Sequence, residues 1–369
     1  MKTVQEQMEA RNALANAAKF RMMQETYDYQ MKLTHAELLV QGFLDHPDIN
    51  GMAFVSVGGL DSITLLCFIR KVCGISADYV PAVSVSSLED RSIQKVHKEL
   101  GVKVLRPLKN KVQVLNEFGW PVLSKEIAGK ISLLQNPSPK NATVRHAIIT
   151  GETGAYGGNQ KNSRMKMSQK WLEKFGGYEN EAEGTNYGIP DFKVSDRCCY
   201  YLKERPCDLY AKETGRFPFM GLMASEGGRR AKALALNGCN YISPGTKRSA
   251  PFAIFSRQDV LQLALDLDVP VPEIYGEIVR DPDGTLRTTG AQRTGCSMCG
   301  FGIQLEKRPH RFDLLYFRNP KEWDFWMNRV VKREDGTTYG WGHILDYLDI
   351  EWRNPEQFNF GDQMTMEDL

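Results

Sequence analysis

Two close pairs of cysteines are the residues of this chain best suited to chemistry. Cys198 and Cys199 are adjacent, and Cys296 and Cys299 form a C-x-x-C pair. In a reducing compartment, cysteines spaced in this way are more often metal ligands or redox groups than disulfides. Four thiolates can hold an iron–sulfur cluster or a structural zinc ion. The side chains of adjacent cysteines diverge, which favours a multi-metal cluster over a single zinc ion.

A glycine-bearing turn at residues 55–62 is the second candidate site. Gly58 and Gly59 allow the backbone to approach an anion closely, and the N-terminus of the helix that follows attracts negative charge. Asp61 can cap that helix or hold a metal on a pyrophosphate, and the Ser62 hydroxyl can donate to a phosphate. A tight strand-to-helix connection with an Asp-Ser cap is the simpler interpretation of the same residues.

Alternating strands and helices are predicted around this turn. Strands are expected over residues 53–57, 79–85 and 102–105, with helices over residues 62–72 and 89–100. Two helices are expected within the first 45 residues. Buried strands that alternate with helices predict an α/β fold with a Rossmann-like parallel sheet covered on both faces. The turn then lies at the carboxyl end of the first strand, where such sheets bind ligands.

The rest of the chain is less regular. Residues 134–195 are rich in Gly and Pro without a clean period, which predicts an insertion of loops and short helices. Regular pattern returns with expected strands at 219–224 and 240–242 and helices at 227–237 and 256–267, the last capped by Ser256. Tail helices are expected at 321–332 and 343–349. We therefore divide the chain into N-terminal helices (1–45), a central domain (46–310) and a C-terminal tail (311–369).

Composition sets the broad class. With 47 Lys+Arg against 45 Asp+Glu, the formal charge is +2, so no overall charge imbalance points to nucleic acid or an anionic membrane. The most apolar run, residues 53–69, is interrupted by Asp61 and two glycines, so no membrane span is expected. Residues 1–20 carry charges throughout and do not read as a secretory signal. We expect a cytoplasmic protein.

The glycine turn resembles the S-G-G-x-D-S loop of the ATP pyrophosphatase (PP-loop) superfamily, with Val57 where that loop has its first serine. The two cysteine pairs resemble the C-C-x-x-R-K-x-x-P and G-C-x-x-C motifs of cluster-bearing adenylylsulfate and phosphoadenylylsulfate (PAPS) reductases. This resemblance implies an adenine nucleotide α-hydrolase-like fold. It implies a [4Fe-4S] cluster on Cys198, Cys199, Cys296 and Cys299, and an adenine nucleotide (ATP, adenylylsulfate or PAPS), with Mg²⁺ as a candidate companion. Cys207 is an alternative fourth ligand to Cys199, or it packs as a small apolar residue.

A third segment, residues 219–230, resembles the G-x-R-x-x-E-S-x-x-R segment of the same reductases, whose arginines meet phosphate or sulfate. Glu226 and Arg230 match by register, whereas Met223 replaces an arginine and Gly227 a serine. A solvated helix turn is the simpler interpretation. The nucleotide-binding residues implied by the resemblance are Ser56, Gly58, Gly59, Asp61, Ser62, Glu226, Arg229 and Arg230.

Two further groups of residues each allow two interpretations. Ser86, Ser87, Glu89 and Asp90 follow the second expected strand, where a carboxylate commonly meets a ribose hydroxyl, and helix capping explains them equally well. Arg287, Arg293, Lys307 and Arg308 lie close to the C-x-x-C pair in the sequence, where positive charge would attract an anionic substrate, and surface solvation explains each of them as well. No role is assigned to the six histidines.

The resemblance implies a sulfonucleotide-reductase-like protein in sulfur transfer or sulfonucleotide chemistry, with thioredoxin or another thiol as reductant. These reductases use a cysteine near the C-terminus, and this chain has no cysteine after Cys299. Cys207 and Cys239 are therefore the candidate nucleophiles. One alternative is ATP-dependent thiolation of nucleic acid, with nucleic acid as a partner. Another is a non-catalytic nucleotide-binding subunit of a defence or mobile-element complex.

Overall fold

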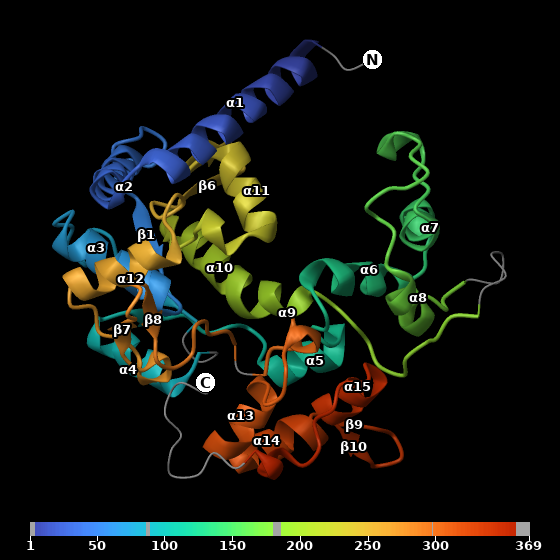
Figure 1. Ribbon diagram of the computed structural model, residues 1–369. Helices are drawn as coiled ribbons and strands as arrows, with labels where there is room; N and C mark the ends of the chain where they lie inside the picture. Colours follow the sequence, from blue (N-terminus) through green and yellow to red (C-terminus); the bar gives the residue numbers. More distant parts are fainter. Residues whose placement is uncertain (1–3, 86–88, 180–185, 297, 359–369) are drawn as a thin grey trace. The chain divides into compact units, whose positions relative to one another are not determined.

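The computed structural model describes residues 4–85, 89–179, 186–296 and 298–358 (Figure 1). These residues form two compact units that interleave along the chain. Unit 1 comprises the described residues of 1–106 and 205–297, and unit 2 those of 107–204 and 298–362. The N-terminal helices thus belong to unit 1, and the region 134–195 to unit 2. The division into three parts by sequence stays a prediction.

A six-stranded sheet forms the centre of unit 1, in the order β3-β2-β1-β4-β6-β5. Its strands are β1 (Ala53–Ser56), β2 (Ala82–Ser84), β3 (Lys103–Val104), β4 (Phe217–Met220), β5 (Asn240–Ser243) and β6 (Thr246–Ser249). All neighbours are parallel except the edge pair β5 and β6. The predicted Rossmann-like α/β class is therefore confirmed.

Two strands differ from the sequence-based expectation. Strand β4 begins and ends earlier than the predicted 219–224, because its partner β1 pairs with it only from Phe217 to Met220. Strand β6 was not predicted, since its residues Thr246–Ser249 are polar and basic. Pairing with β5 and β4 therefore defines this strand, because its side chains carry no apolar strand pattern.

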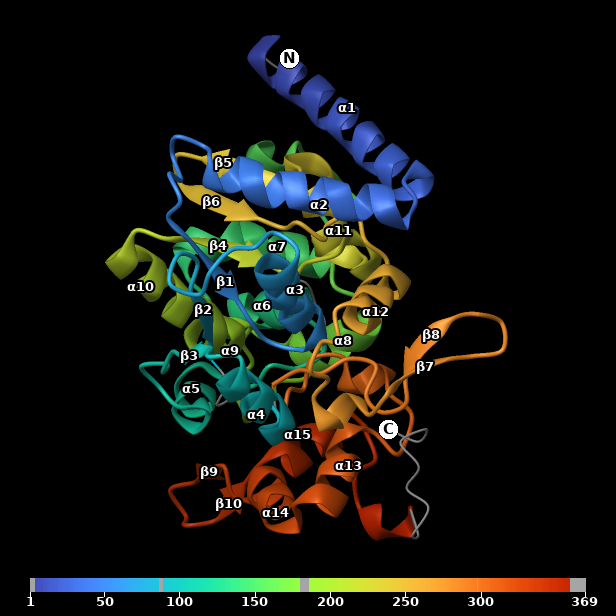
Figure 2. The same cartoon turned by 90° about the vertical axis from the view of Figure 1, so that its left-hand side faces the viewer.

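Unit 1 also contains α-helices. They are α1 (Val4–Thr26), α2 (Tyr29–Leu44), α3 (Leu60–Lys71), α4 (Arg91–Glu99), α10 (Arg205–Thr214), α11 (Gly228–Asn237) and α12 (Arg257–Asp266). Of these, α1 packs against α11. The Ser256 cap predicted for α12 is confirmed, because its hydroxyl accepts from the Asp259 N–H in a reciprocal capping box. The hairpin β7 (Ile278–Arg280) and β8 (Leu286–Thr288) completes the unit. Figure 2 shows α2 lying across the end of the sheet that holds β5 and β6.

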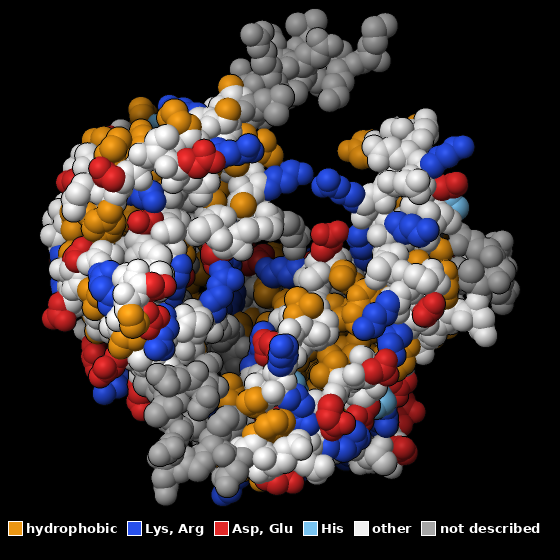
Figure 3. Space-filling model, viewed as in Figure 1, with side chains coloured by type: hydrophobic (Ala, Val, Ile, Leu, Met, Phe, Trp, Pro, Cys, Tyr) orange, Lys and Arg blue, Asp and Glu red, His pale blue; other side chains and the backbone are white. Residues whose placement is uncertain are grey.

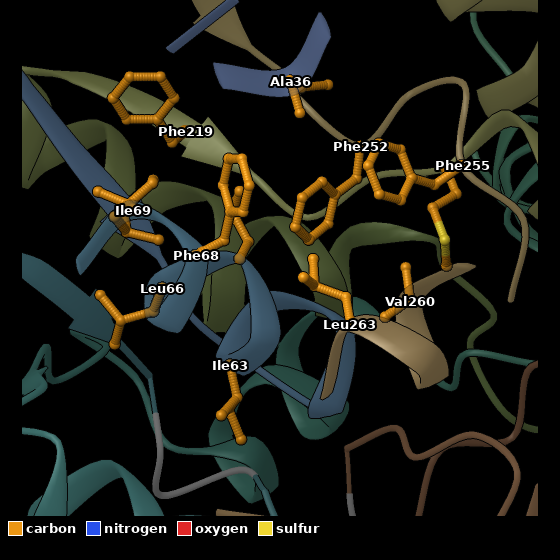
Figure 4. Close-up of a cluster of buried hydrophobic side chains, with 14 of the residues drawn as sticks. Ala36, Ile63, Leu66, Phe68, Ile69, Phe219, Phe252, Phe255, Val260 and Leu263 are labelled. Atoms are coloured by element: carbon orange, nitrogen blue, oxygen red, sulfur yellow. The ribbon is translucent and has the colours of Figure 1, made fainter. Parts of the chain in front are cut away.

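Both faces of the sheet are buried, as the alternation of β1 side chains shows. Ala53 and Val55 point into a core shared with α2, α3 and α12, which includes Phe68, Phe219 and Phe252 (Figure 4). Phe54, between them, faces the other side and packs edge-on against Tyr210 of α10, with ring centroids 5.2 Å apart. Two-sided burial explains why β1 reads as a continuous apolar run.

Unit 2 is largely helical. Its α-helices are α5 (Lys111–Phe118), α6 (Lys125–Gln135), α7 (Ala142–Thr150), α8 (Gln169–Phe175), α9 (Arg197–Cys199), α13 (Arg311–Arg318), α14 (Pro320–Asn328) and α15 (Trp341–Tyr347). A short hairpin joins β9 (Val331–Lys332) to β10 (Thr338–Tyr339). Its core is aromatic, with Trp341 in contact with both Trp120 and Phe312.

Surface properties agree with the near-neutral charge. On the face shown in Figure 3, acidic and basic side chains are interspersed with apolar ones. Among the helices of the described residues, none combines the length and apolar character needed to cross a membrane.

Candidate functional site

The strand order places the glycine turn at a switch point of the sheet. From β1 the chain proceeds through β2 to β3 on one side, whereas β4 pairs with β1 on the other. Open α/β sheets bind ligands at such a point, outside the carboxyl ends of the two strands. The loops that follow β1 and β4 touch here, because a Cβ on Gly221 would lie 2.9 Å from Ser62 Cα. Glycine at 221 is therefore required by this close approach.

The turn itself is held by its own hydrogen bonds. The Gly58 N–H donates to Ser62 Oγ over 2.7 Å, and that hydroxyl donates to the Gly59 carbonyl over 2.9 Å. The predicted hydroxyl of Ser62 is thus engaged within the loop. The N–H groups of Gly59 and Asp61 donate no hydrogen bond to any described residue. These two donors at the start of α3 suit an anion.

A buried tyrosine lies directly over the turn. The Leu60 N–H donates to Tyr275 Oη over 3.1 Å, and that hydroxyl lies 2.6 Å from Thr294 Oγ1. A Cβ on Gly59 would overlap the Tyr275 hydroxyl and come within 2.9 Å of Thr294 Oγ1. These contacts connect the glycine turn to Thr294, which is two residues before Cys296.

His97 supports the turn from the α4 side. Its ring Nε2 lies 2.7 Å from the Gly58 carbonyl and must donate a proton to it. Burial lowers the pKa of His97, so the neutral ring is favoured. No sequence pattern selects this histidine, because no spacing links position 97 to position 58. Tyr275 and Thr294 were missed for the same reason.

The carboxylates predicted after the second strand divide into two roles. Asp90 caps α4 by accepting from the Ser92 N–H over 2.8 Å, which confirms the capping interpretation. Glu89 is buried, and its Oε1 lies 3.9 Å from where a Cβ on Gly58 would be. Glu89 therefore faces the glycine turn. Ser86 and Ser87 lie outside the described residues.

Two carboxylates and three arginines form ion pairs beside the glycine turn. Asp61 forms an ion pair with Arg257, and Glu226 forms ion pairs with both Arg230 and Arg293. Burial raises the pKa of the Asp61 carboxyl and the charge of Glu226 adds to this, while Arg257 opposes it. Three guanidinium groups thus meet two carboxylates, which leaves one positive charge for an anion. Arg229 lies in α11 beside them, and its side chain is not among those described.

Both departures from the reductase pattern are buried. Val57 is 5% exposed and lies in the apolar core, and its N–H continues the β ladder to Val83. Met223 is 2% exposed in the same core. Neither side chain is available to a phosphate, whereas Ser56 at the end of β1 is partly exposed.

The tandem cysteines lie in unit 2, at an irregular helical turn. Cys198 and Cys199 end the short helix α9, which passes into a π-helical segment, Tyr200–Glu204. Such segments are rare and frequently mark functional sites. Burial raises the pKa of the Cys199 thiol, the charges of Lys125 and Lys203 lower it, and Cys299 raises it. Cys199 and Cys299 are therefore near neighbours, and Lys125 donates to the Cys199 sulfur.

The C-x-x-C segment is divided between the units. Cys299 belongs to unit 2, where its carbonyl accepts from the Arg311 guanidinium over 3.1 Å. Gly300 packs so tightly against Trp341 and the Pro121 carbonyl that no Cβ fits. Cys296 belongs to unit 1, and Ser297 lies outside the described residues. Within the described part of the chain, no three Cys, His, Asp or Glu side chains are grouped as ready metal ligands. The four-cysteine set stays a prediction.

The two candidate nucleophiles differ in burial. Cys239 is buried in the apolar core, which raises its pKa to about 11. A thiol of that pKa is almost entirely protonated at neutral pH and is a weak nucleophile. Cys207 is partly exposed in α10. Burial therefore favours Cys207 over Cys239 for thiolate chemistry.

Comparison with known proteins finds a likeness among solved structures. No family model and no curated protein matches the chain. Among solved structures, the chain is similar to the crystal structure of phosphoadenylyl-sulfate (PAPS) reductase from Candida auris in complex with phosphate. The sequence identity is 12% and the TM-score 0.32, and the match covers 72% of this chain and 95% of that chain.

Proposed function

We propose that unit 1 binds the phosphate groups of an adenine nucleotide at the glycine turn, and that the protein acts in sulfur transfer or sulfonucleotide chemistry. The contact of Gly221 with Ser62 is the observation that carries the nucleotide proposal, because it joins the loops after β1 and β4 at the switch point. The adenine base and the sulfur chemistry come from the resemblance of the motifs.

Each part of the site has a proposed role. The N–H groups of Gly59 and Asp61 would bind phosphate oxygens, as donors at a helix N-terminus do. Arg230, Arg257 and Arg293 would exchange a carboxylate for a phosphate or sulfate when the nucleotide binds, because their bidentate forks suit both kinds of group. The Asp61 carboxylate, once released from Arg257, would hold Mg²⁺ on the nucleotide.

We propose further that Cys198, Cys199, Cys296 and Cys299 hold a [4Fe-4S] cluster. The closeness of Cys199 and Cys299 supports this ligand set, and Lys125 beside Cys199 favours the thiolate form that ligation requires. Such a cluster, when bound, can supply electron transfer. Cys207 remains the alternative fourth ligand.

ATP-dependent thiolation of nucleic acid is the second candidate function. Sulfonucleotide reduction needs a nucleophilic thiol, for which Cys207 and Cys239 are the candidates within this chain. Of the two internal candidates, Cys239 is disfavoured by its pKa of about 11. Thiolation consumes ATP and releases pyrophosphate without requiring that thiol.

Thermal unfolding tests the nucleotide site. ATP, adenylylsulfate or PAPS should raise the Tm of the wild type by mass action. Gly59→Ala should abolish the rise, since its Cβ overlaps the Tyr275 hydroxyl, and Asp61→Ala should reduce it. Gly42→Ala is the matched control, because a Cβ there meets nothing within 4 Å. A wild type whose Tm none of the three nucleotides changes would contradict the proposal.

Product analysis separates the two chemistries. Sulfite release from the sulfated nucleotide with a thiol reductant identifies a reductase, and loss of that release in Cys207→Ser, with Cys239→Ser as control, identifies the thiol. Pyrophosphate release that depends on nucleic acid and a sulfur donor identifies a thiolase. A protein that binds nucleotide and gives neither product is a binding subunit.

The cluster has its own test. Anaerobically purified protein should be brown, with iron and sulfide in near-equal amounts, and Cys199→Ser or Cys299→Ser should lose both. Lys95→Gln, an exposed change in unit 1, is the control. A colourless protein that holds one zinc ion would contradict the cluster.

A further inference from the structure

A closed loop in unit 2 presents a fully exposed tyrosine. The loop runs from Gly151 to Ser163, and its ends meet through the Ser163 N–H and the Gly151 carbonyl, 2.9 Å apart. Within it, the Thr153 N–H donates to the Gln160 carbonyl over 2.9 Å, and the Gln160 N–H donates to Thr153 Oγ1 over 2.9 Å. We call residues 151–163 the Tyr156 loop.

The tip of the Tyr156 loop is fixed by the same threonine. Thr153 Oγ1 donates to the Gly157 carbonyl over 2.9 Å, and a Cβ on Gly157 would lie 2.6 Å from Thr153 Cβ. Gly158 has a φ of +76°, a conformation that favours glycine. The exposed position of Tyr156 therefore follows from a hydrogen-bonded backbone rather than from a lack of structure.

The apolar ring of Tyr156 is not buried. Its relative exposure is 109%, against 52% or less for the other tyrosines among the exposed large hydrophobic side chains. Burial of an aromatic ring is normally favourable. A ring held out on an ordered loop is suited to stacking on a planar group of a partner.

Cations surround this loop. Residues 140–170 contain six Lys and Arg and one Glu, a net charge of +5, so the rest of the chain sums to −3 against a total of +2. Among the exposed cations, those that form no ion pair with described residues are Lys140, Lys161, Arg164, Lys166 and Lys170. Figure 3, viewed as Figure 1, shows Lys and Arg side chains over the part of unit 2 that holds α7 and this loop.

Backbone contacts bring these cations to the loop. A Cβ on Gly151 would lie 3.4 Å from both the Lys161 carbonyl and Lys166 Cβ. At the other end, Gly154 lies against Thr143 at the start of α7, three residues after Lys140. The Arg164 carbonyl accepts from the buried Lys130 ammonium over 2.9 Å, which fixes the base of the loop.

We propose that the Tyr156 loop and its cations bind single-stranded nucleic acid. An aromatic side chain that stacks on an unpaired base, flanked by cations that follow the phosphates, is the usual arrangement for such binding. A duplex keeps its bases stacked and offers no free face to Tyr156. The Tyr156 loop belongs to unit 2 and the glycine turn to unit 1, and this proposal does not depend on the nucleotide proposal.

Fluorescence anisotropy with labelled 20-residue RNA and DNA oligonucleotides of mixed sequence tests the proposal on the full-length protein. Wild type should bind both single strands more tightly than the matching duplex. Lys161→Gln with Lys166→Gln should weaken binding and lower the slope of log affinity against log salt by roughly 1.4, at about 0.7 per phosphate contact. Lys95→Gln with Lys212→Gln, both exposed in unit 1, should leave the slope unchanged.

Tyr156→Ala separates base stacking from charge. It should weaken binding of the single strands by roughly 5- to 150-fold with little change in the salt slope. Tyr79→Ala, which removes another exposed tyrosine, is the control. The proposal is overturned if wild type fails to bind single strands at low salt, or if Tyr156→Ala binds them as well as wild type does. Equal binding of polyglutamate that depends on Lys161 and Lys166 alone would also overturn it, since it would show a surface for any polyanion.

Discussion

The glycine-turn region of unit 1 and the cysteine region of unit 2 are built in different ways. Around the turn, Gly58, Gly59, Asp61 and Ser62 form one short segment, and the strand order brings the loop after β4 against it. The cysteine region brings together Cys199, at the end of α9, and Cys299, which are far apart in the sequence. The four residues of the turn itself are placed by the strand that precedes them and the helix that follows. A site built on distant segments depends on how each is packed.

Glycine substitutions test this contrast with the largest expected effect. In Gly221→Ala the new Cβ would lie 2.9 Å from Ser62 Cα, and in Gly300→Ala it would lie 2.8 Å from the Pro121 carbonyl and overlap Trp341. Each should lose roughly 1–3 kcal/mol of unfolding free energy through overpacking. Urea denaturation measures the loss, with Gly42→Ala as the neutral or stabilising control. Only Gly221→Ala should also abolish the nucleotide-induced rise in Tm. Equal loss of that rise in Gly300→Ala would break the comparison.

The Tyr275 hydroxyl is the next test. Tyr275→Phe leaves the buried Leu60 N–H without its acceptor and removes the contact to Thr294. We expect a loss of about 1–3 kcal/mol, measured by urea denaturation. Tyr241→Phe is the control, because the Tyr241 hydroxyl has no hydrogen-bond partner among the described residues. An equal effect of both variants would mean that Tyr275 contributes only its ring.

Lys125 tests the cysteine region. The charge of Lys125 lowers the pKa of Cys199 more than the charge of Lys203 does. In reduced, metal-free protein, Lys125→Met should therefore slow the reaction of Cys199 with iodoacetamide at pH 8 by roughly several-fold, because less thiolate is present. Lys203→Met should slow it less. Mass spectrometry of the labelled Cys199 peptide gives the rates, and a reversed order would contradict this account.

The smallest expected effect is the pH dependence that His97 gives to the free energy of unfolding. Burial lowers its pKa below the ordinary 6.5, so the folded state favours the neutral ring. The contribution of neutral His97 to the free energy of unfolding is present above the unfolded-state pKa of about 6.5. This contribution is lost as the pH falls from that value through the folded-state pKa. His97→Gln should therefore show a shallower fall in unfolding free energy between pH 7 and pH 5 than wild type does. His46→Gln, at a partly exposed position, should keep the wild-type slope.

Local pattern was enough to predict much of unit 1. Apolar runs, a period of 3.6 and the Ser256 cap predicted the N-terminal helices, the strand before the turn and helix α12, because each depends on side chains close in sequence. The polar strand β6 was missed, since pairing with β4 and β5 defines it. Helices α5 and α6 were not predicted either.

The composition of the glycine turn was evident in the sequence, whereas its surroundings were decided by tertiary structure. Two glycines before Asp61 and Ser62 indicate a strand-to-helix turn by their backbone preferences alone. That His97 donates to Gly58, that Tyr275 covers Gly59 and that Arg257 pairs with Asp61 depend on residues 39 to 215 positions away. Side chains so distant meet only when the sheet order and the packing of α4 and α12 bring them together, and no local pattern encodes that meeting.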